Sequence, residues 1–329
     1  MIKIKIKEIS VCHGNKVVNN DPYIEHFKKQ GKDIEHFLHD VIGRDKRYLF
    51  DDEKDNSLSY AILAAQQVLD KSGYKGADMD MIVLSSQLPE YTAPPSCMHI
   101  HHAIGGKSEC VCYDINVNCA GMTISLEQVS KYMSVTPHVK RALIVGCDYI
   151  NLTVDPDSEC TYGHYGDASC AIILERTQEE CGLIDSIYDV KSEEHNNILF
   201  PGCGFSNLFK VKEQNELRLK WIPFESNVPN TATESIKKLL KRNKLEANDV
   251  RMFCLSQYVY RNIEKIREII GIDESRSLYI GDEYGYTGTT SPFIVLYEAI
   301  ERGLVKRGDK IVFWTVGAGA ENISLLYQY

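Results

Sequence analysis

The sequence lacks an apolar run near the ~18 residues that a membrane-spanning helix requires. Its start, Met1-Ile-Lys-Ile-Lys-Ile-Lys, alternates apolar with charged side chains, so it lacks the apolar segment of a signal peptide and predicts a half-buried strand. The chain has no excess of basic residues either: 37 lysines and arginines stand against 46 aspartates and glutamates, a formal charge of −9. Such an acidic surface repels nucleic-acid phosphates and anionic lipids. We therefore expect a cytoplasmic protein that binds neither nucleic acid nor membranes.

The 11 cysteines lack the spacing of a zinc finger. The chain has no Cys-x-x-Cys pair, and Cys110-x-Cys112 has no second pair at the required distance. His101 and His102 follow a proline-rich loop, but the sequence shows no third ligand beside them, so they are interpreted as solvent or interface residues. These observations predict no metal site. Most of the cysteines act as small apolar residues in this interpretation, and the odd count leaves room for one reactive thiol.

Helix and strand patterns alternate through much of the chain. Ser57–Ser72 has an apolar stripe at helical spacing and ends at Gly73, whereas Met81–Leu84 and Arg141–Val145 are the continuous apolar runs of buried strands. Further helices are expected at residues 98–104, 120–132, 231–241 and 291–301, and further strands at 113–117, 168–175, 252–255, 310–315 and 323–329. Apolar strands separated by helices indicate an α/β protein, with a mainly parallel sheet covered on both faces.

The second half of the chain repeats the order of the first. Leu84 and Leu255 end matching strands, and 35 residues beyond each stand Cys119 and Thr290, both at a predicted helix start. We interpret this internal repeat as a duplicated α/β unit, with an N-terminal half over residues 1–176 and a C-terminal half over 177–329. Residues from about 177 to 230 are expected to form an irregular, polar excursion. No flexible linker separates the halves, so they should pack as one body.

Cys119 is the strongest candidate for a reactive residue. It lies in Asp114-Ile-Asn-Val-Asn-Cys-Ala-Gly-Met-Thr, where a predicted strand meets a helix through a tight turn. Such a corner projects a side chain out of the sheet. The free amides and the dipole of a helix N-terminus also favour a thiolate over a thiol. On position alone, a buried structural cysteine fits equally well.

Seven short stretches, spread in a fixed order along nearly the whole chain, match the motifs of a known family. They are the Cys119 turn, Ile42-Gly-Arg-Asp-Lys-Arg, Asp148 with Asp155-Pro156, Tyr165-Gly-Asp-Ala, Gly285-Tyr-Thr-Gly-Thr-Thr-Ser, Arg302-Gly-Leu-Val-Lys-Arg-Gly-Asp and Gly317-Ala-Gly-Ala. Together they resemble the β-ketoacyl-acyl-carrier-protein synthase III family of thiolase-fold condensing enzymes. The resemblance implies a thiolase-like fold in which the duplicated unit forms α-β-α-β-α layers. It also implies that Cys119 accepts an acyl group from a thioester, with the amides of Cys119 and Gly319 or a neighbour as an oxyanion hole.

Two residues that the family uses for decarboxylative condensation are replaced. Gln257 stands in the position of the family's histidine, and Tyr286 in that of its asparagine. A glutamine amide or a tyrosine hydroxyl can donate a hydrogen bond to an oxyanion, but neither is a general base near pH 7. By register, His164 lies on a segment that lines the family's tunnel, so it is a candidate replacement base. The alternative is a strand histidine that is hydrogen-bonded to the backbone.

The thioester-binding end differs from the family as well. The family holds the adenine of coenzyme A between a tryptophan and an arginine, and Phe37 and Val41 stand at these two positions. One stacking ring and the cation are therefore lost, which favours a carrier protein or another thioester as the acyl donor. Trp221 opens the stretch Trp221–Asn227, which matches a tunnel-lining segment. The acyl group would arrive on phosphopantetheine, with no permanently bound cofactor. Candidate docking surfaces for an acidic acyl-carrier protein, each with a solvated face as its alternative, are Lys210, Lys212, Arg218 and Lys220, and Lys237-Lys238 with Lys241-Arg242.

The sequence thus predicts an acyltransferase that moves an acyl group from a carrier-protein or coenzyme A thioester through Cys119 to an acceptor, in fatty-acid-like, polyketide or specialised-metabolite synthesis. The alternative is a catalytically impaired partner subunit of a heterodimeric ketosynthase. By resemblance, the strand Val111–Val117 lies at a sheet edge and pairs with its two-fold mate in a homodimer. Pro94, in the loop Glu90–Ser96, stands where the family has a bulky aromatic that closes the partner's pocket, so acyl groups longer than acetyl are expected to fit.

Overall fold

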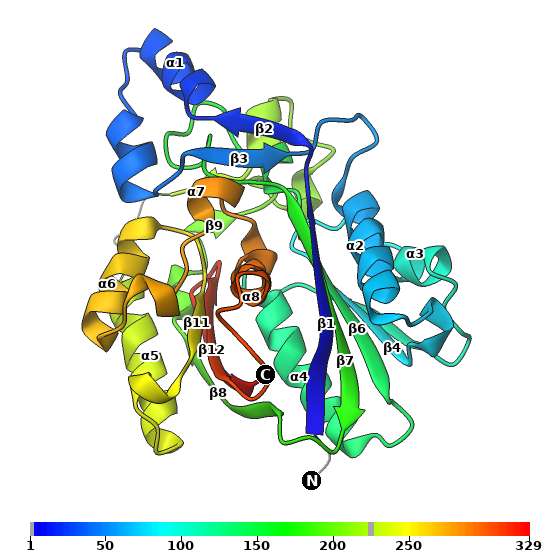
Figure 1. The fold of residues 1–329 in the computed structure, drawn as a ribbon. Coiled ribbons are helices and arrows are strands. Elements are labelled where there is room, and N and C mark those ends of the chain that lie inside the picture. The colour runs from blue at the N-terminus through cyan, green and yellow to red at the C-terminus, as the bar shows by residue number, and fades with distance from the viewer. Residues whose placement is uncertain (1–2, 223–226) are drawn as a thin grey trace.

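In the computed structural model, which describes residues 3–222 and 227–329, the two larger β-sheets form two layers with helices between them and outside them (Figure 1). The five-stranded sheet has, in spatial order, β1 (Lys3–His13), β7 (Ala168–Thr177), β6 (Arg141–Asp148), β4 (Met81–Ser85) and β5 (Val111–Ile115). The four-stranded sheet has β11 (Met252–Leu255), β12 (Lys310–Gly317), β13 (Glu321–Gln328) and β8 (Gly182–Val190). Each half of the chain therefore supplies one sheet.

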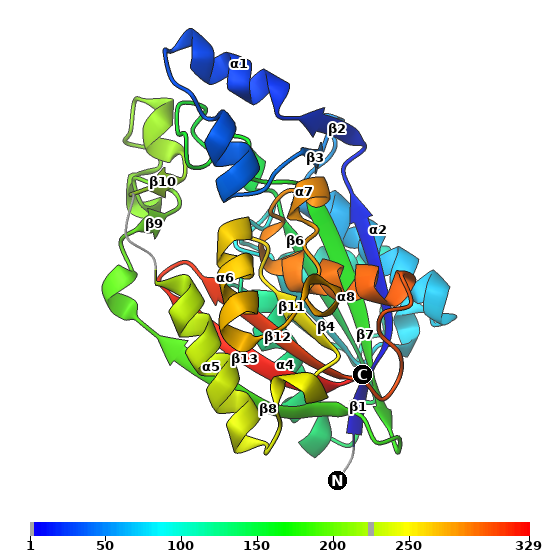
Figure 2. The same ribbon diagram turned by 60° about the vertical axis from the view of Figure 1, so that its left-hand side comes forward.

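Helices cover both faces of each sheet. The helices α4 (Gly121–Val135) and α8 (Ser291–Glu301) lie between the sheets (Figures 1 and 2). The outer face of the first sheet is covered by α2 (Ser57–Ser72) and α3 (Ser96–Ala103). The outer face of the second sheet is covered by α5 (Val228–Arg242) and α6 (Tyr260–Ile270). A separate apolar cluster fills each of the spaces that these layers enclose. The α-β-α-β-α layering predicted from the sequence is confirmed.

The duplication appears in the strand pairing. β4 pairs with β6 in parallel, β6 with β7 in antiparallel and β7 with β1 in antiparallel, and the pairs β11–β12, β12–β13 and β13–β8 repeat these directions. The first sheet has β5 in addition, parallel to β4 and at the sheet edge. This places the strand that leads to Cys119 at an edge, as expected.

The best-predicted helices have clear start and stop signals. Asn56 caps α2, since its side chain accepts hydrogen bonds from the amides of Leu58 and Ser59 at 3.0 and 2.8 Å. Gly73 then ends the helix in the left-handed conformation, with φ of 76°. The bounds of α2, α8 and β11 agree with the predicted ones, and the other predicted elements shift by a few residues.

The excursion predicted for residues 177–230 is wrong in its first part. Residues 182–190 form β8, a regular strand that pairs with β13. Asp185, Ser186 and Asp189 interrupt its apolar residues, so its sequence lacks the continuous apolar run of a buried strand. The described residues from 191 to 222 are irregular, with the short pair β9 (Ile198–Leu199) and β10 (Lys220–Trp221).

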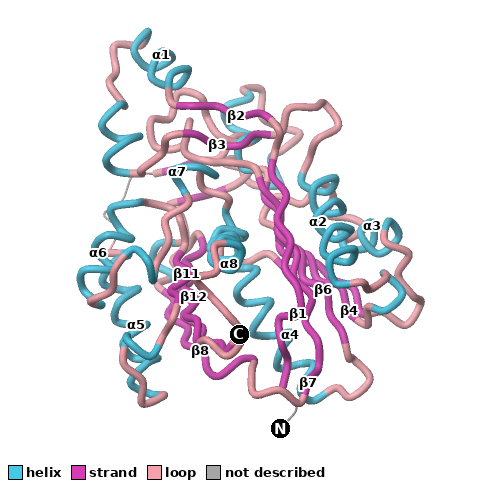
Figure 3. The backbone as a smooth tube through the Cα atoms, viewed as in Figure 1, coloured by secondary structure: helices cyan, strands magenta, loops and turns pink. Residues whose placement is uncertain are grey.

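A small cap that the sequence did not predict lies at one end of the sheets (Figure 3). It comprises β2 (Lys16–Asn19), α1 (Asp21–Lys29), a π-helical turn (Phe37–Val41), β3 (Lys46–Leu49) and, nearby, α7 (Gly281–Tyr284). Two fully buried arginines attach it to the rest. Arg44 donates to the carbonyl oxygens of His164, Gln257 and Tyr258 at 3.1, 2.8 and 2.9 Å, and Arg47 donates to that of Gly163 at 2.7 Å. Among the described residues, no helix is long and apolar enough to cross a membrane.

Candidate active site

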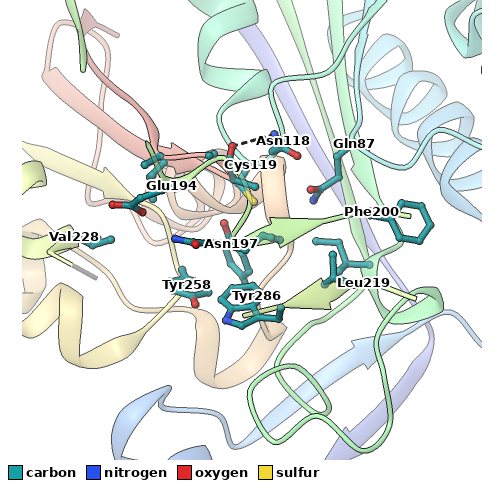
Figure 4. A pocket seen from close by; sticks show the side chains of 18 of the residues that line it. Gln87, Asn118, Cys119, Glu194, Asn197, Phe200, Leu219, Val228, Tyr258 and Tyr286 are labelled. Atoms are coloured by element: carbon teal, nitrogen blue, oxygen red, sulfur yellow. Dashed lines mark hydrogen bonds between the residues drawn. The ribbon is translucent and has the colours of Figure 1, made fainter. Parts of the chain in front are cut away.

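The residues that follow several strand ends surround a pocket that is partly open to solvent. Cys119, after β5, directs its sulfur into this space, and Gln87 and Tyr286 lie around it (Figure 4). Much of the remaining lining is apolar: Leu88, Ile150, Phe200, Leu219, Trp221 and Val316. A thiol therefore lies in a cavity suited to an apolar chain.

The backbone at Cys119 is held in an unusual turn. Asn118 has a positive φ of 48°, and the amide of Ala120 donates to the carbonyl of Val117 at 3.0 Å. The glycine turn after β12 packs directly against it, because a Cβ on Gly317 would lie 2.8 Å from the Val117 carbonyl oxygen. Thr315 donates its hydroxyl to the carbonyl of Cys119 at 3.1 Å. The turn is thus fixed from both halves of the chain.

The thiol of Cys119 differs from the expected thiolate. Burial raises its pKa to about 12, and the nearby charge of Asp148 acts in the same direction. Hydrogen bonds from the Tyr286 hydroxyl, the Gln87 amide and the backbone of Cys119 itself lower the pKa but do not outweigh burial. The helix-dipole prediction fails here because α4 begins only at Gly121, and desolvation of the anion is the larger effect.

Gln87 and Asp148 form a polar chain behind the thiol. The backbone and side-chain amides of Gln87 donate to the two carboxylate oxygens of Asp148 at 2.9 and 3.3 Å. The amide of Thr289 donates to the same carboxylate at 3.1 Å. Burial raises the pKa of Asp148 to about 6. Gln87 was not predicted as a site residue, although it follows β4 at the same distance as Gln257 follows β11, and this match was a usable signal.

Gln257 does not line the pocket, contrary to its predicted role. Its side-chain amide donates to the carbonyls of Leu255 and Leu278 at 2.8 and 3.3 Å, and its carbonyl accepts from the amide of Ile280 at 2.8 Å. The side chain is fully buried in these backbone contacts. Tyr258, the next residue, faces the pocket instead.

His164 is also outside the pocket lining, so the prediction that it faces the tunnel is wrong. The imidazole lies behind the rings of Tyr165, Tyr258 and Tyr286, with centroids 4.9, 5.1 and 5.7 Å away. Neither ring nitrogen has a hydrogen-bond partner among the described residues. Burial and the charges of Arg44 and Arg47 hold the pKa of His164 well below its ordinary value. The alternative of a backbone-bonded ring is therefore not met either.

Aromatic residues form one wall of the pocket. Tyr286 lies beside Cys119, and its hydroxyl is 3.3 Å from the Ser256 hydroxyl. Tyr258 packs against Tyr286, with ring centroids 5.5 Å apart, and stacks on Trp221 at 5.8 Å. Trp221 and Gly319 therefore line the pocket, as expected, and Gly319 has a φ of 83°. Residues 223–226 of the predicted tunnel-lining stretch lie outside the described residues.

Phe37 and Val41 do not reach the pocket. Both lie in the π-helical turn and pack into the apolar cluster of the cap with Leu38 and Ile42. Their predicted role at the coenzyme A end thus finds no support in the geometry of the single chain, since their half-buried side chains contribute to a local core.

Comparisons with known proteins agree on one family. Residues 113–192 match the profile described as 3-oxoacyl-[acyl-carrier-protein] synthase III, and residues 240–329 match the profile of its C-terminal part. β-Ketoacyl-[acyl-carrier-protein] synthase III of Helicobacter pylori strain Shi470 is 26% identical over 283 residues, covering 84% of each chain.

Solved structures extend the similarity to the whole fold. 3-Oxoacyl-[acyl-carrier-protein] synthase III of Aquifex aeolicus superimposes with a TM-score of 0.84 at 20% identity, covering 99% of this chain and 100% of that one. OleA of Xanthomonas campestris, solved with lauric acid and lauroyl-CoA, gives a TM-score of 0.84 at 16% identity and covers 99% of both chains. The predicted thiolase-like fold is confirmed.

Proposed function

Because the chain belongs to the 3-oxoacyl-[acyl-carrier-protein] synthase III family, we propose that it is an acyltransferase in which Cys119 takes an acyl group from a thioester and passes it to an acceptor. One observation carries this proposal: the thiol of Cys119 lies in a largely apolar pocket, beside the glycine turn that contains Gly319. A purely structural subunit has no need of a thiol at this position.

The first step is a thioester exchange. The Cys119 thiol loses its proton as its sulfur bonds to the acyl carbonyl carbon, the bond from that carbon to the donor sulfur breaks, and the departing thiolate takes up a proton. The amides of Cys119 and Gly319 are the proposed donors to the oxyanion that forms in between. Since burial keeps Cys119 protonated at neutral pH, the Tyr286 hydroxyl and the Gln87 amide would stabilise the transient thiolate by hydrogen bonds.

The acyl donor would be a phosphopantetheine thioester, on an acyl-carrier protein or on coenzyme A. Lys220 is exposed between the pocket-lining Leu219 and Trp221, which supports this basic cluster as the docking surface for an acidic carrier. Arg218 of the same cluster donates to the carbonyl of Val154 at 2.5 Å. In the other candidate cluster, Arg242 is engaged by Asp185 in two hydrogen bonds of 2.6 Å. The apolar lining supports acyl chains longer than acetyl, and OleA, the structural neighbour, was solved with a lauroyl thioester.

A homodimer is part of the same proposal. β5 is an edge strand, and Val111 at its start is 36% exposed on the single chain. Exposed backbone and apolar side chains at a sheet edge favour pairing with a second copy. Sedimentation showing a monomer at micromolar concentration would contradict this.

The partner-subunit alternative keeps a specific observation in its favour. The Gln257 amide is fully engaged by backbone groups, and Tyr286 occupies the asparagine position, so the pair that serves decarboxylation in the family is replaced at both positions. A chain that neither condenses nor accepts an acyl group would retain this fold only to complete a second subunit.

Acylation of the intact protein separates the two functions. The protein is incubated with acetyl, octanoyl and lauroyl thioesters of coenzyme A and of an acyl-carrier protein, and each product is weighed by mass spectrometry. We expect one acyl group per chain, lost in Cys119→Ala and retained in Cys203→Ala, a matched change outside the pocket. No acylation by any donor, or acylation that persists in Cys119→Ala, would overturn the proposal and favour the partner subunit.

A further inference from the structure

Three residues with metal-ligating side chains meet where α3 packs on the edge strand β5, away from the pocket, and a fourth, Cys97, lies beside one of them. His101, Cys110 and Cys112 each offer one ligand atom, and these atoms lie within 4.8 Å of one another. Cys97, which is fully buried, shares a hydrogen bond between its thiol and that of Cys112. The sequence shows no third ligand beside the two histidines, whereas packing brings two thiols to His101.

The backbone explains why these side chains converge. Cys97 and His101 are four residues apart on α3 and so lie on one helix face. Cys110 directly precedes β5 and Cys112 is its second residue, so their side chains, two positions apart, point to one side of the sheet. Asp114 continues that side and accepts from the amide of Cys97 at 2.9 Å, which holds the start of α3 on the strand.

The sulfur geometry fits a tetrahedral metal. The Sγ atoms of Cys110 and Cys112 are 3.7 Å apart. Two thiolates that each lie about 2.3 Å from a tetrahedral zinc ion are themselves about 3.8 Å apart. A disulfide would instead need about 2.05 Å.

His101 already makes the second contact that metal-bound histidines usually make. Its Nε2 lies 2.9 Å from the carbonyl oxygen of Lys107, which fixes Nε2 as the protonated nitrogen and leaves Nδ1 as a free electron-pair donor. The ring is held closely, because a Cβ on Gly106 would lie 2.3 Å from it. Such positioning lowers the entropic cost of metal binding.

The thiols of the cluster already contact one another. Cys112 shares hydrogen bonds with both Cys110 and Cys97. A dication would replace the shared thiol protons and satisfy the same sulfur atoms.

We propose that His101, Cys110, Cys112 and Cys97 bind one Zn²⁺ ion that fastens α3 to β5. Each coordinating thiol releases its proton to solvent when the ion binds. The ion is structural, since four protein ligands leave no open position for a substrate. It steadies the edge strand that continues into the turn of Cys119. This inference is independent of the proposed acyl transfer.

Metal content and cobalt spectroscopy test the site in the full-length chain. The protein is stripped with a chelator under reducing conditions, and Zn²⁺ or Co²⁺ alone is then titrated back. We expect about one ion per chain, with cobalt giving thiolate charge-transfer and tetrahedral d–d absorption. His101→Ala and Cys112→Ser should each weaken binding at least about tenfold. The matched variants His102→Ala, exposed on the same helix, and Cys203→Ser should bind as the wild type does.

Three results would overturn the inference: no ion bound at micromolar Zn²⁺ or Co²⁺, equal binding by the wild type and by His101→Ala and Cys112→Ser, or a disulfide between two of these cysteines in the freshly isolated protein. Should a variant fold poorly, the cobalt spectrum of the wild-type chain still decides, because octahedral or sulfur-free absorption contradicts the ligand set. Cys119→Ala should keep its zinc while losing acylation, so the two proposals fail separately.

Discussion

The environment of Cys119 makes a quantitative prediction about its reactivity with pH. A thiol with a pKa of about 12, as burial imposes here, is deprotonated to only about one part in 10⁴ at pH 8. A thiol at the reference value of 9.0 would be deprotonated to about one part in ten at the same pH. The difference of about 10³ corresponds to roughly 4 kcal/mol that burial adds to ionisation.

The assay is alkylation of Cys119 by iodoacetamide, measured peptide by peptide with mass spectrometry between pH 6.5 and about 10.5. Circular dichroism at each pH confirms that the fold persists. We expect the rate at Cys119 to rise about tenfold per pH unit across this range without levelling off, because the thiolate is the reacting form. Limited access of the reagent scales every rate equally and leaves the shape of the profile unchanged, so the shape reports the pKa.

Variants of the groups around the sulfur give the sign of each effect. Tyr286→Phe and Gln87→Leu remove hydrogen bonds that favour the thiolate, so each should slow alkylation, by about tenfold for a bond to a charged acceptor. Tyr258→Phe, on the same pocket wall, is the matched control and should change the rate less than about twofold. A plateau at or below pH 8.5, or faster alkylation in Tyr286→Phe, would refute the reasoning.

Two further predictions concern buried polar groups. Gln257→Leu should lower the free energy of unfolding by about 1–3 kcal/mol, because the amide of Ile280 and the carbonyl of Leu255 lose their hydrogen-bond partner. Chemical denaturation would show this as a lower midpoint, and an unchanged midpoint would show that these hydrogen bonds do not form. Burial raises the pKa of Asp167 to about 7, above the ordinary 3.8. The folded protein therefore favours the protonated carboxyl, and the stability associated with it is present at pH 4 and is lost as the pH rises through 7. The free energy of unfolding of Asp167→Asn, measured with urea, should therefore rise by about 4 kcal/mol relative to that of the wild type between pH 4 and pH 8. If the difference between the two free energies is the same at every pH, the raised pKa is contradicted.

Local sequence signals determined the elements and the fold. Capped helices such as α2, continuous apolar strands such as β4 and the repeated order of both halves specify the layers, because periodicity and end signals are local properties of the chain. The same signals placed Cys119 at a strand-to-helix corner, whereas the family resemblance placed β5 at a sheet edge. β8 was missed because Asp185, Ser186 and Asp189 interrupt its apolar residues, and a search for continuous apolar runs does not detect such a strand.

Only the tertiary structure decided the chemical state and the partners of the side chains. The direction of Gln257, the tyrosines in front of His164 and the desolvation of the Cys119 thiol depend on groups far away in the chain, such as Ile280 and Asp148. The convergence of His101 with Cys110 and Cys112 arises in the same way, because a helix face and a strand face meet only after packing. Sequence spacing specifies which residues share a face of one element, whereas hydrogen bonding, burial and metal coordination depend on what lies opposite that face in space.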